Sequence, residues 1–397
     1  MPTVSQRGAL APSSPIRKLV PFADAAKARG TQVYHLNIGQ PDIETPAVMR
    51  QALNEYSETV IAYGPSGGDQ AFRDFLIAYY AGLDVELAPN NLIVTTGGSE
   101  AVFFAFAACL DAGDEILVPD PMYANYLGYS TILGCPIKPI PTRVEDGYHL
   151  PADIEAHITP KTKAILLCNP ANPTGAVYTD AEMDAISAVC LKHDLFLIAD
   201  EVYREFVYDG PTVRSILTRP ELAELAVVVD SLSKRYSLCG ARIGCLVSKN
   251  DAVMAAAMKF AQARLSPPAL AQVVAAHAGE VSPDYFEAVK SEYRKRRDVV
   301  YEALAAIDGV VAHRPSGAFY QMARLPVDDS ERFVRWMLEE FSLDGWTTMV
   351  APGGGFYAQE GAGTDEVRIA YVLNTEDLTR AMRILASALD AYPGRTA

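Results

Sequence analysis

Short apolar runs alternate with helical patterns through the middle of the chain. The runs are rich in β-branched residues and end at turn residues; they are Asn91–Thr96, Glu115–Pro119, Ala164–Asn169, Leu195–Asp200 and Ala226–Ser231. Between two of them, Thr179 and Glu182 have capping-box spacing, which predicts a helix that runs to about His193. Uninterrupted apolar runs are typical of strands that are buried on both faces of a parallel sheet. The pattern predicts an α/β fold, in which helices sandwich a mostly parallel central sheet.

The pattern changes in the last third of the chain. Ser282 and Pro283 begin a long amphipathic helix that reaches about Ile307. Three predicted strands follow, with helices between them and at the end: Ala318–Ala323, Trp346–Ala351 and Glu366–Val372. A single core stops growing at about 250–300 residues, so we expect two domains. We place a large domain at residues 47–284 and a small α/β domain, formed by both ends of the chain, at residues 1–46 and 285–397.

Composition and charge narrow the range of partners. The 397 residues include 34 Lys and Arg against 49 Asp and Glu, a net charge of −15. A chain this acidic repels phosphate backbones and anionic lipid, so we expect no nucleic-acid or membrane partner. No apolar run approaches the length of a membrane-spanning helix. The six cysteines are scattered without C-x-x-C pairs or a histidine cluster, which predicts buried thiols, no metal site and a cytoplasmic protein.

The strongest chemical signal follows the run Ala226–Ser231. In α/β sheets, ligands bind beyond the carboxyl ends of the strands, and Ser231, Ser233 and Lys234 stand at such an end, with Arg242 shortly after. Hydroxyls and a guanidinium are suitable donors to a phosphate, and a lysine amine can form an imine with an aldehyde. The segment resembles the pyridoxal-phosphate (PLP) lysine signature of the class I/II aminotransferases, which include aspartate aminotransferase and have the fold called fold type I. The resemblance implies that Lys234 holds PLP covalently and acts as the catalytic base and acid.

Two further motifs occur in the order that this family has. Asp200 and Tyr203 belong to Asp-Glu-Val-Tyr after the run Leu195–Asp200, and Asn172 belongs to the motif Asn169–Gly175, which reads N-P-x-N-P-T-G. The resemblance implies that Asp200 pairs with the pyridine nitrogen, and that Tyr203 donates to the 3-oxygen of the cofactor. It implies that Asn172 contacts this oxygen and the substrate carboxylate. A carboxylate beside the ring nitrogen keeps it protonated, which makes the ring an electron sink.

A phosphate site is predicted where Gly97, Gly98 and Ser99 join a strand to a helix. Backbone N–H groups at a helix N-terminus point toward an approaching anion, and the helix dipole favours it. Together with Ser231, Ser233 and Arg242, these residues would form a phosphate cup.

Four more residues are assigned by the resemblance alone. Tyr123 occupies the position of the aromatic residue that stacks on the pyridine ring and contacts substrate. Arg368 matches the arginine that grips the substrate α-carboxylate, and Gly39 matches a backbone contact to the substrate. Tyr63 matches a tyrosine that reaches the cofactor phosphate of the neighbouring subunit, which implies a homodimer with shared active sites.

Two departures from the family pattern affect the expected substrate. Many relatives have Trp before the phosphate arginine, where this chain has Ala241. Ser99 stands where relatives of the bacterial aspartate subgroup often carry a lysine for the second carboxylate of the substrate, a role that Arg264 or another basic residue could take. The hypothesis is an aminotransferase that moves the amino group of an L-amino acid, with aspartate as first choice, to a 2-oxo acid such as 2-oxoglutarate. Aromatic amino acids and alanine are the next donors, and another fold-type I enzyme such as a carbon–sulfur β-lyase is the alternative.

Overall fold

A seven-stranded sheet forms the centre of the computed structural model, which describes residues 2–210 and 212–396. The strand order is β2-β8-β7-β6-β5-β3-β4. The strands are β2 (Leu92–Thr95), β3 (Glu115–Asp120), β4 (Ile137–Pro141), β5 (Thr162–Cys168), β6 (Phe196–Asp200), β7 (Ala226–Ser231) and β8 (Gly244–Ser248). Only β8 runs against its neighbours, because it pairs antiparallel with both β7 and β2. The predicted mostly parallel sheet is therefore confirmed.

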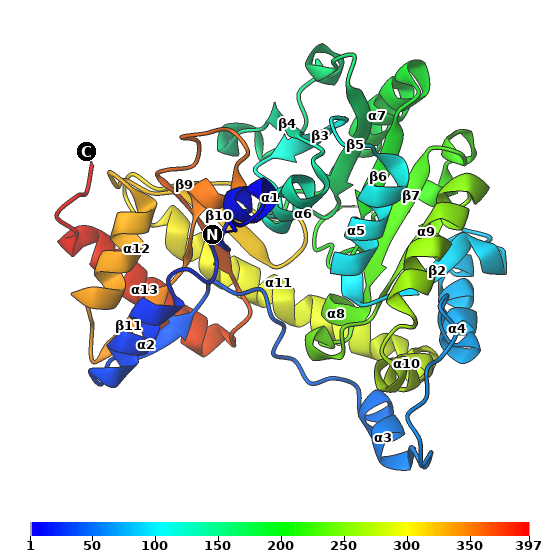
Figure 1. The fold of residues 1–397 in the computed structure, drawn as a ribbon. Helices are drawn as coiled ribbons and strands as arrows, with labels where there is room; N and C mark the ends of the chain where they lie inside the picture. Colours follow the sequence, from blue (N-terminus) through cyan, green and yellow to red (C-terminus); the bar gives the residue numbers. More distant parts are fainter. Residues whose placement is uncertain (1, 211, 397) are drawn as a thin grey trace.

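Helices cover both faces of this sheet, as the apolar runs require (Figure 1). On one face, α5 (Gly97–Cys109), α6 (Asn125–Leu133) and α9 (Asp251–Arg264) pack against strand residues such as Leu166. On the other face, α4 (Gln70–Ala81), α7 (Asp180–His193) and α10 (Ala269–Ala276) pack against residues such as Ile165. Successive strand residues thus enter two separate cores, which is why each strand is apolar at every position.

Segments from the two ends of the chain form two smaller sheets. β1 (Gln32–His35) pairs in parallel with β11 (Trp346–Met349). An antiparallel sheet has the order β12-β13-β10-β9, with β9 (Val311–Ala312), β10 (Tyr320–Arg324), β12 (Ala351–Pro352) and β13 (Glu366–Ala370). The prediction of one strand over Trp346–Ala351 was wrong, because β11 and β12 flank Val350 and pair in different sheets. Figure 1 shows both chain ends on the side that holds these sheets.

The remaining helices are α1 (Gln6–Leu10), α2 (Val20–Ala28), α3 (Ala47–Glu55), α8 (Leu232–Arg235), α11 (Pro283–Ala305), α12 (Ser330–Glu339) and α13 (Thr375–Ala391). Of these, α2, α12 and α13 pack against the smaller sheets, whereas α3 and α8 belong to the large core and α1 lies against α6. The start of α11 packs against the large core through Phe286, and its later residues Tyr293 and Val300 belong to the core of the smaller sheets. The predicted domain boundary after residue 284 lies at the start of this helix and stays a prediction. Within residues 2–210 and 212–396, no helix has both the length and the apolar character needed to cross a membrane.

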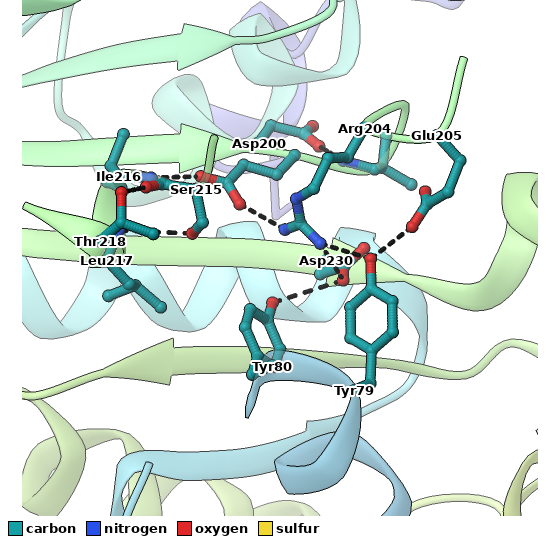
Figure 2. Close-up of polar contacts among 12 residues, drawn as sticks. Tyr79, Tyr80, Asp200, Arg204, Glu205, Ser215, Ile216, Leu217, Thr218 and Asp230 are labelled. Atoms are coloured by element: carbon teal, nitrogen blue, oxygen red, sulfur yellow. Dashed lines mark hydrogen bonds and ion pairs between the residues drawn. The ribbon is translucent and has the colours of Figure 1, made fainter. Parts of the chain in front are cut away.

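A buried cluster of charges ties α8 to the central sheet. Asp230, on β7, has a fully buried carboxylate that accepts two hydrogen bonds from the Arg235 guanidinium, at 2.8 and 2.7 Å. Tyr80 donates to the same carboxylate at 3.3 Å, and Arg204 lies 3.7 Å from it (Figure 2). The Arg204 guanidinium also donates to the hydroxyl of Tyr79, at 2.6 Å. Because a buried charge is tolerated only with partners, each member of this cluster holds the others in place.

We predict that Asp230→Ala lowers the free energy of unfolding by about 3–5 kcal/mol, since two buried guanidinium groups lose a carboxylate: Arg204 loses the one at 3.7 Å, and Arg235 keeps only its pair with Glu205 at 3.1 Å. Urea denaturation measures this change. The matched control is Arg380→Ala, which breaks the exposed pair of Arg380 with Glu376 on α13 and should cost at most about 1 kcal/mol. Equal effects of the two substitutions would contradict the prediction.

Candidate active site

A cavity of about 690 Å³ opens at the carboxyl ends of the central strands. The N-terminal segment, the central sheet and β13 all contribute to its wall. Most of the residues singled out in the sequence line it: Gly39, Gly98, Ser99, Tyr123, Asn172, Asp200, Tyr203, Ser231, Ser233, Lys234, Arg242 and Arg368. Segments that are distant in sequence are thus brought to one cavity, at the place where α/β sheets bind ligands.

Lys234 lies on α8, the single helical turn that follows β7. Its Nζ donates to the carbonyl of Gly39 at 2.7 Å and lies 3.8 Å from Sγ of Cys239. The ammonium also lies 5.8 Å from the centre of the Phe319 ring. Among residues 2–210 and 212–396, no carboxylate forms an ion pair with Lys234. A half-buried amine without a counter-ion is available for chemistry in the cavity.

Asp200 ends β6 beneath the cavity and is buried. The Tyr126 hydroxyl donates to its Oδ2 at 2.7 Å, and the backbone N–H of Val202 donates to Oδ1 at 3.3 Å. No described basic side chain forms an ion pair with it. Burial raises the pKa of Asp200 to about 6, although the bond from Tyr126 acts in the opposite direction. The site therefore has a carboxylate that lacks a cation.

The predicted phosphate cup lies at the start of α5. Ser231 and Ser233 line the same wall, with their Oγ atoms 2.9 Å apart. Arg242 has left-handed backbone (φ +56°), and its guanidinium reaches Gly97 so closely that a Cβ there would lie 2.7 Å from a guanidinium nitrogen. Gly97 itself has φ +72°, so a side chain is excluded both by backbone strain and by contact. Hydroxyls, an arginine and free helix N–H groups converge here, as phosphate binding requires.

Gly244 allows this cup to form. A Cβ on Gly244 would lie 2.5 Å from the Asp230 carbonyl and 2.9 Å from the backbone nitrogen of Gly98. The first turn of α5 can therefore approach the β7–β8 pair only because this position has no side chain.

Arg368, on β13, enters the cavity from the opposite side and is almost completely buried. It donates to Oδ1 of Asn172 at 3.0 Å and to the carbonyl of Asn37 at 2.8 Å. The rings of Tyr320 and Phe356 lie 4.5 and 4.6 Å from the guanidinium carbon. Its Nε has no hydrogen-bond partner, and no described carboxylate pairs with it. Burial lowers the pKa of Arg368, as expected for a guanidinium without a counter-ion.

Polar side chains connect the two sides of the cavity. The hydroxyls of Tyr203 and Tyr320 lie 2.8 Å apart, and Nδ2 of Asn172 donates to Tyr203 at 3.4 Å. The position of Tyr320 also explains why residue 39 is a glycine, because a Cβ at this residue would lie 1.9 Å from the tyrosine hydroxyl.

The structure adds residues that the sequence reasoning missed. Tyr126 lies in α6, three residues after Tyr123, which precedes this helix, and the two rings meet edge-on with their centres 5.3 Å apart. Tyr320 and Asn37 had no comparable signal, since each reaches the site through pairing between distant strands. Asn125 donates to the Tyr123 hydroxyl at 2.7 Å and orients this ring.

Two predicted residues lie elsewhere. Tyr63 is 81% exposed and does not line the cavity of its own chain. Arg264 is engaged away from the cavity, where it pairs with Glu100 at 2.9 Å and donates to the carbonyl of Ser66 at 2.9 Å.

The chain is similar to many known proteins. The family model described as aminotransferase class I and II matches residues 31–385. The aspartate aminotransferase of Geobacillus stearothermophilus is 31% identical, over 93% of this chain and 94% of that protein. The aspartate/prephenate aminotransferase of Thermus thermophilus is also 31% identical, over 91% of this chain and 92% of that protein.

Solved structures agree with these sequence matches. Aspartate aminotransferase from Thermus thermophilus with maleate has a TM-score of 0.88 at 29% identity, covering 98% of this chain and 100% of that chain. Alanine aminotransferase from Pyrococcus furiosus also has a TM-score of 0.88 at 29% identity, covering 97% of this chain and 99% of that chain. The chain therefore belongs to the class I and II aminotransferases, a family of PLP-dependent enzymes.

Proposed function

We propose that this aminotransferase takes its amino group from an acidic L-amino acid, with aspartate as first choice, and passes it to a 2-oxo acid such as 2-oxoglutarate. The observation that carries the proposal is Arg368, a buried guanidinium without a carboxylate partner in the cavity that also contains Lys234 and Asp200. An unpaired buried cation needs an anion, and every amino acid and 2-oxo acid has a carboxylate beside its reacting carbon. Relatives named aspartate aminotransferase, and a related structure with the dicarboxylate maleate, support the acidic substrate.

The residues of the cavity fit PLP at three points. The cup of Gly98, Ser231, Ser233 and Arg242 suits its phosphate, with Gly97 and Ser99 completing the turn. Asp200 is a buried carboxylate without a cation, so a protonated pyridine nitrogen would supply the missing charge. Tyr123 would cover one face of the ring.

On the substrate side, we assign complementary roles to the side chains. When bound, PLP supplies an electron sink for the negative charge that develops at the substrate Cα. Lys234 would hold the cofactor covalently; once substrate has displaced it, Nζ would take the proton from the substrate Cα and deliver it to the C4′ carbon of the cofactor. Tyr203 and Asn172 would donate to the ring 3-oxygen. Arg368, with Asn172, would orient the α-carboxylate so that the Cα–H bond faces Nζ.

We also propose a homodimer with shared active sites. Tyr63 is exposed in one chain, next to the exposed apolar residues Val60 and Ile61, and a second copy would cover this segment. Tyr63 would then reach the cofactor phosphate of the partner subunit. All six cysteines are free thiols, which supports the proposed cytoplasmic location.

We predict that the enzyme exchanges amino groups between aspartate and 2-oxoglutarate at steady state, with kcat/KM higher for aspartate than for alanine or phenylalanine. A panel of donors, each assayed with 2-oxoglutarate, measures this. Lys234→Ala is the matched inactive control. A preferred neutral donor would contradict the choice of aspartate, and conversion of substrate without amino exchange would indicate the β-lyase alternative.

We predict that Asp200→Asn retains PLP and lowers turnover by several orders of magnitude. The amide keeps the shape of the carboxylate and cannot hold the ring nitrogen protonated, so the electron sink weakens. Cofactor content by absorbance and kcat on aspartate measure the two effects separately. Near-normal turnover would show that Asp200 is structural only.

We predict that Arg368→Lys reduces kcat/KM for every donor by a similar factor, roughly 5- to 150-fold, or about 1–3 kcal/mol. Lysine keeps the charge and loses the two-pronged donor geometry, and all amino acids share the α-carboxylate. The donor panel used above measures the change. A loss confined to acidic donors would instead place Arg368 at the side-chain end of the substrate.

A further inference from the structure

The cavity wall is strongly cationic although the chain is acidic. Its basic residues are Arg17, Lys234, Arg242 and Arg368, and its one acidic residue is Asp200. If the roles proposed above are accepted, Lys234 serves the cofactor aldehyde, Arg242 its phosphate and Arg368 the α-carboxylate. Arg17 remains without a role.

Neither Ser99 nor Arg264 takes the place of the missing lysine. Ser99 stands at the position where relatives have that lysine, and its hydroxyl has no charge. Arg264 is bound to Glu100 and to two backbone carbonyls, so it does not line the cavity. Arg17 is therefore the basic side chain of this chain that lines the cavity and has no assigned anion.

The turn that carries Arg17 is fixed to the substrate side of the cavity. The carbonyl of Ile16 accepts a hydrogen bond from the Asn37 side chain at 3.0 Å, and the carbonyl of Asn37 accepts one from Arg368 at 2.8 Å. Two residues separate Ile16 from Leu19, which is buried in the core of the smaller sheets. The backbone of Arg17 is thus held between two anchors, one of which leads directly to the α-carboxylate arginine.

The two basic neighbours in this turn face different surroundings. Lys18 forms an ion pair with Glu331 on α12 and does not line the cavity. Arg17 lines the cavity together with Ile16 and Ser14, and its guanidinium has no hydrogen bond or ion pair within the described part of the chain. An arginine without a partner at the mouth of a binding cavity is free to bind a carboxylate with two parallel hydrogen bonds.

We propose that Arg17 binds the second carboxylate of dicarboxylic substrates and so determines the preference for acidic amino acids and 2-oxoglutarate. The proposal rests on the proposed transaminase function and deepens it. Arg368 and Arg17 hold the two ends of the substrate, and the chain of hydrogen bonds through Asn37 fixes the spacing between them. A neutral donor makes only the contact with Arg368.

The test compares Arg17→Gln with the wild-type enzyme, both loaded with PLP. We expect kcat/KM for aspartate and for 2-oxoglutarate to fall about 10- to 100-fold, as for loss of a charge-assisted bond. The ratio of kcat/KM for aspartate to that for phenylalanine should fall by nearly the same factor. Calorimetric titration with succinate, a non-reacting dicarboxylate, should show a matching loss of affinity.

Lys18→Gln is the matched control, because it removes a neighbouring charge that does not face the cavity. It should leave the donor ratio and the affinity for succinate within about twofold of wild type, as for an exposed ion pair. Equal losses for aspartate and phenylalanine in Arg17→Gln would overturn the proposal, as would unchanged binding of succinate. These two outcomes can be distinguished from failure of the proposed function, because in that case the wild-type enzyme would transfer no amino group from any donor.

Discussion

The active site depends on the buried ion pair between Asp230 and Arg235. These residues flank Lys234 on both sides in sequence: Asp230 is in β7, and Arg235 ends α8. Their two short hydrogen bonds therefore fix the turn from which Lys234 projects. The pair is hidden from water, so screening by salt is weak and the geometry is held tightly. A surface salt bridge at this place would hold the amine much less firmly.

The chemical properties of the cavity depend on two buried charged side chains that have no ion-pair partner among the described residues. Asp200 and Arg368 are both buried, and neither has an ion-pair partner among the described residues. Each would be destabilising alone, because a buried charge without a partner costs several kcal/mol. The surrounding fold must supply this energy, and the ring nitrogen of the proposed cofactor and the α-carboxylate of the proposed substrate would each offset one of these charges.

The local pattern of apolar and polar residues was sufficient to predict much of the fold. Ala226–Ser231 was predicted with its observed bounds, and β2, β3, β5 and β6 were placed within two residues, because their runs are largely apolar. β4, at the edge of the sheet, was not predicted. β8 was also not predicted, since the glycines at 240 and 244, before it and at its start, resemble a loop. Its antiparallel direction comes from pairing with β2 and β7. Within the site, motif residues were found, whereas Tyr320 and Arg17 reach the cavity through tertiary contacts that leave no local trace.

The chain as a whole is negatively charged, whereas the cavity wall is positively charged. The distance over which each set of charges acts determines which one a substrate in the cavity experiences. The net charge of −15 is spread over a solvent-accessible surface of 16964 Å². At physiological ionic strength, exposed charges more than about 8 Å away are largely screened. Inside the cavity, the low dielectric and the converging guanidinium groups act on a substrate over a few ångströms, where screening is weakest. An anionic amino acid therefore responds to Arg368 and its neighbours once it enters, and the acidic exterior does not prevent binding.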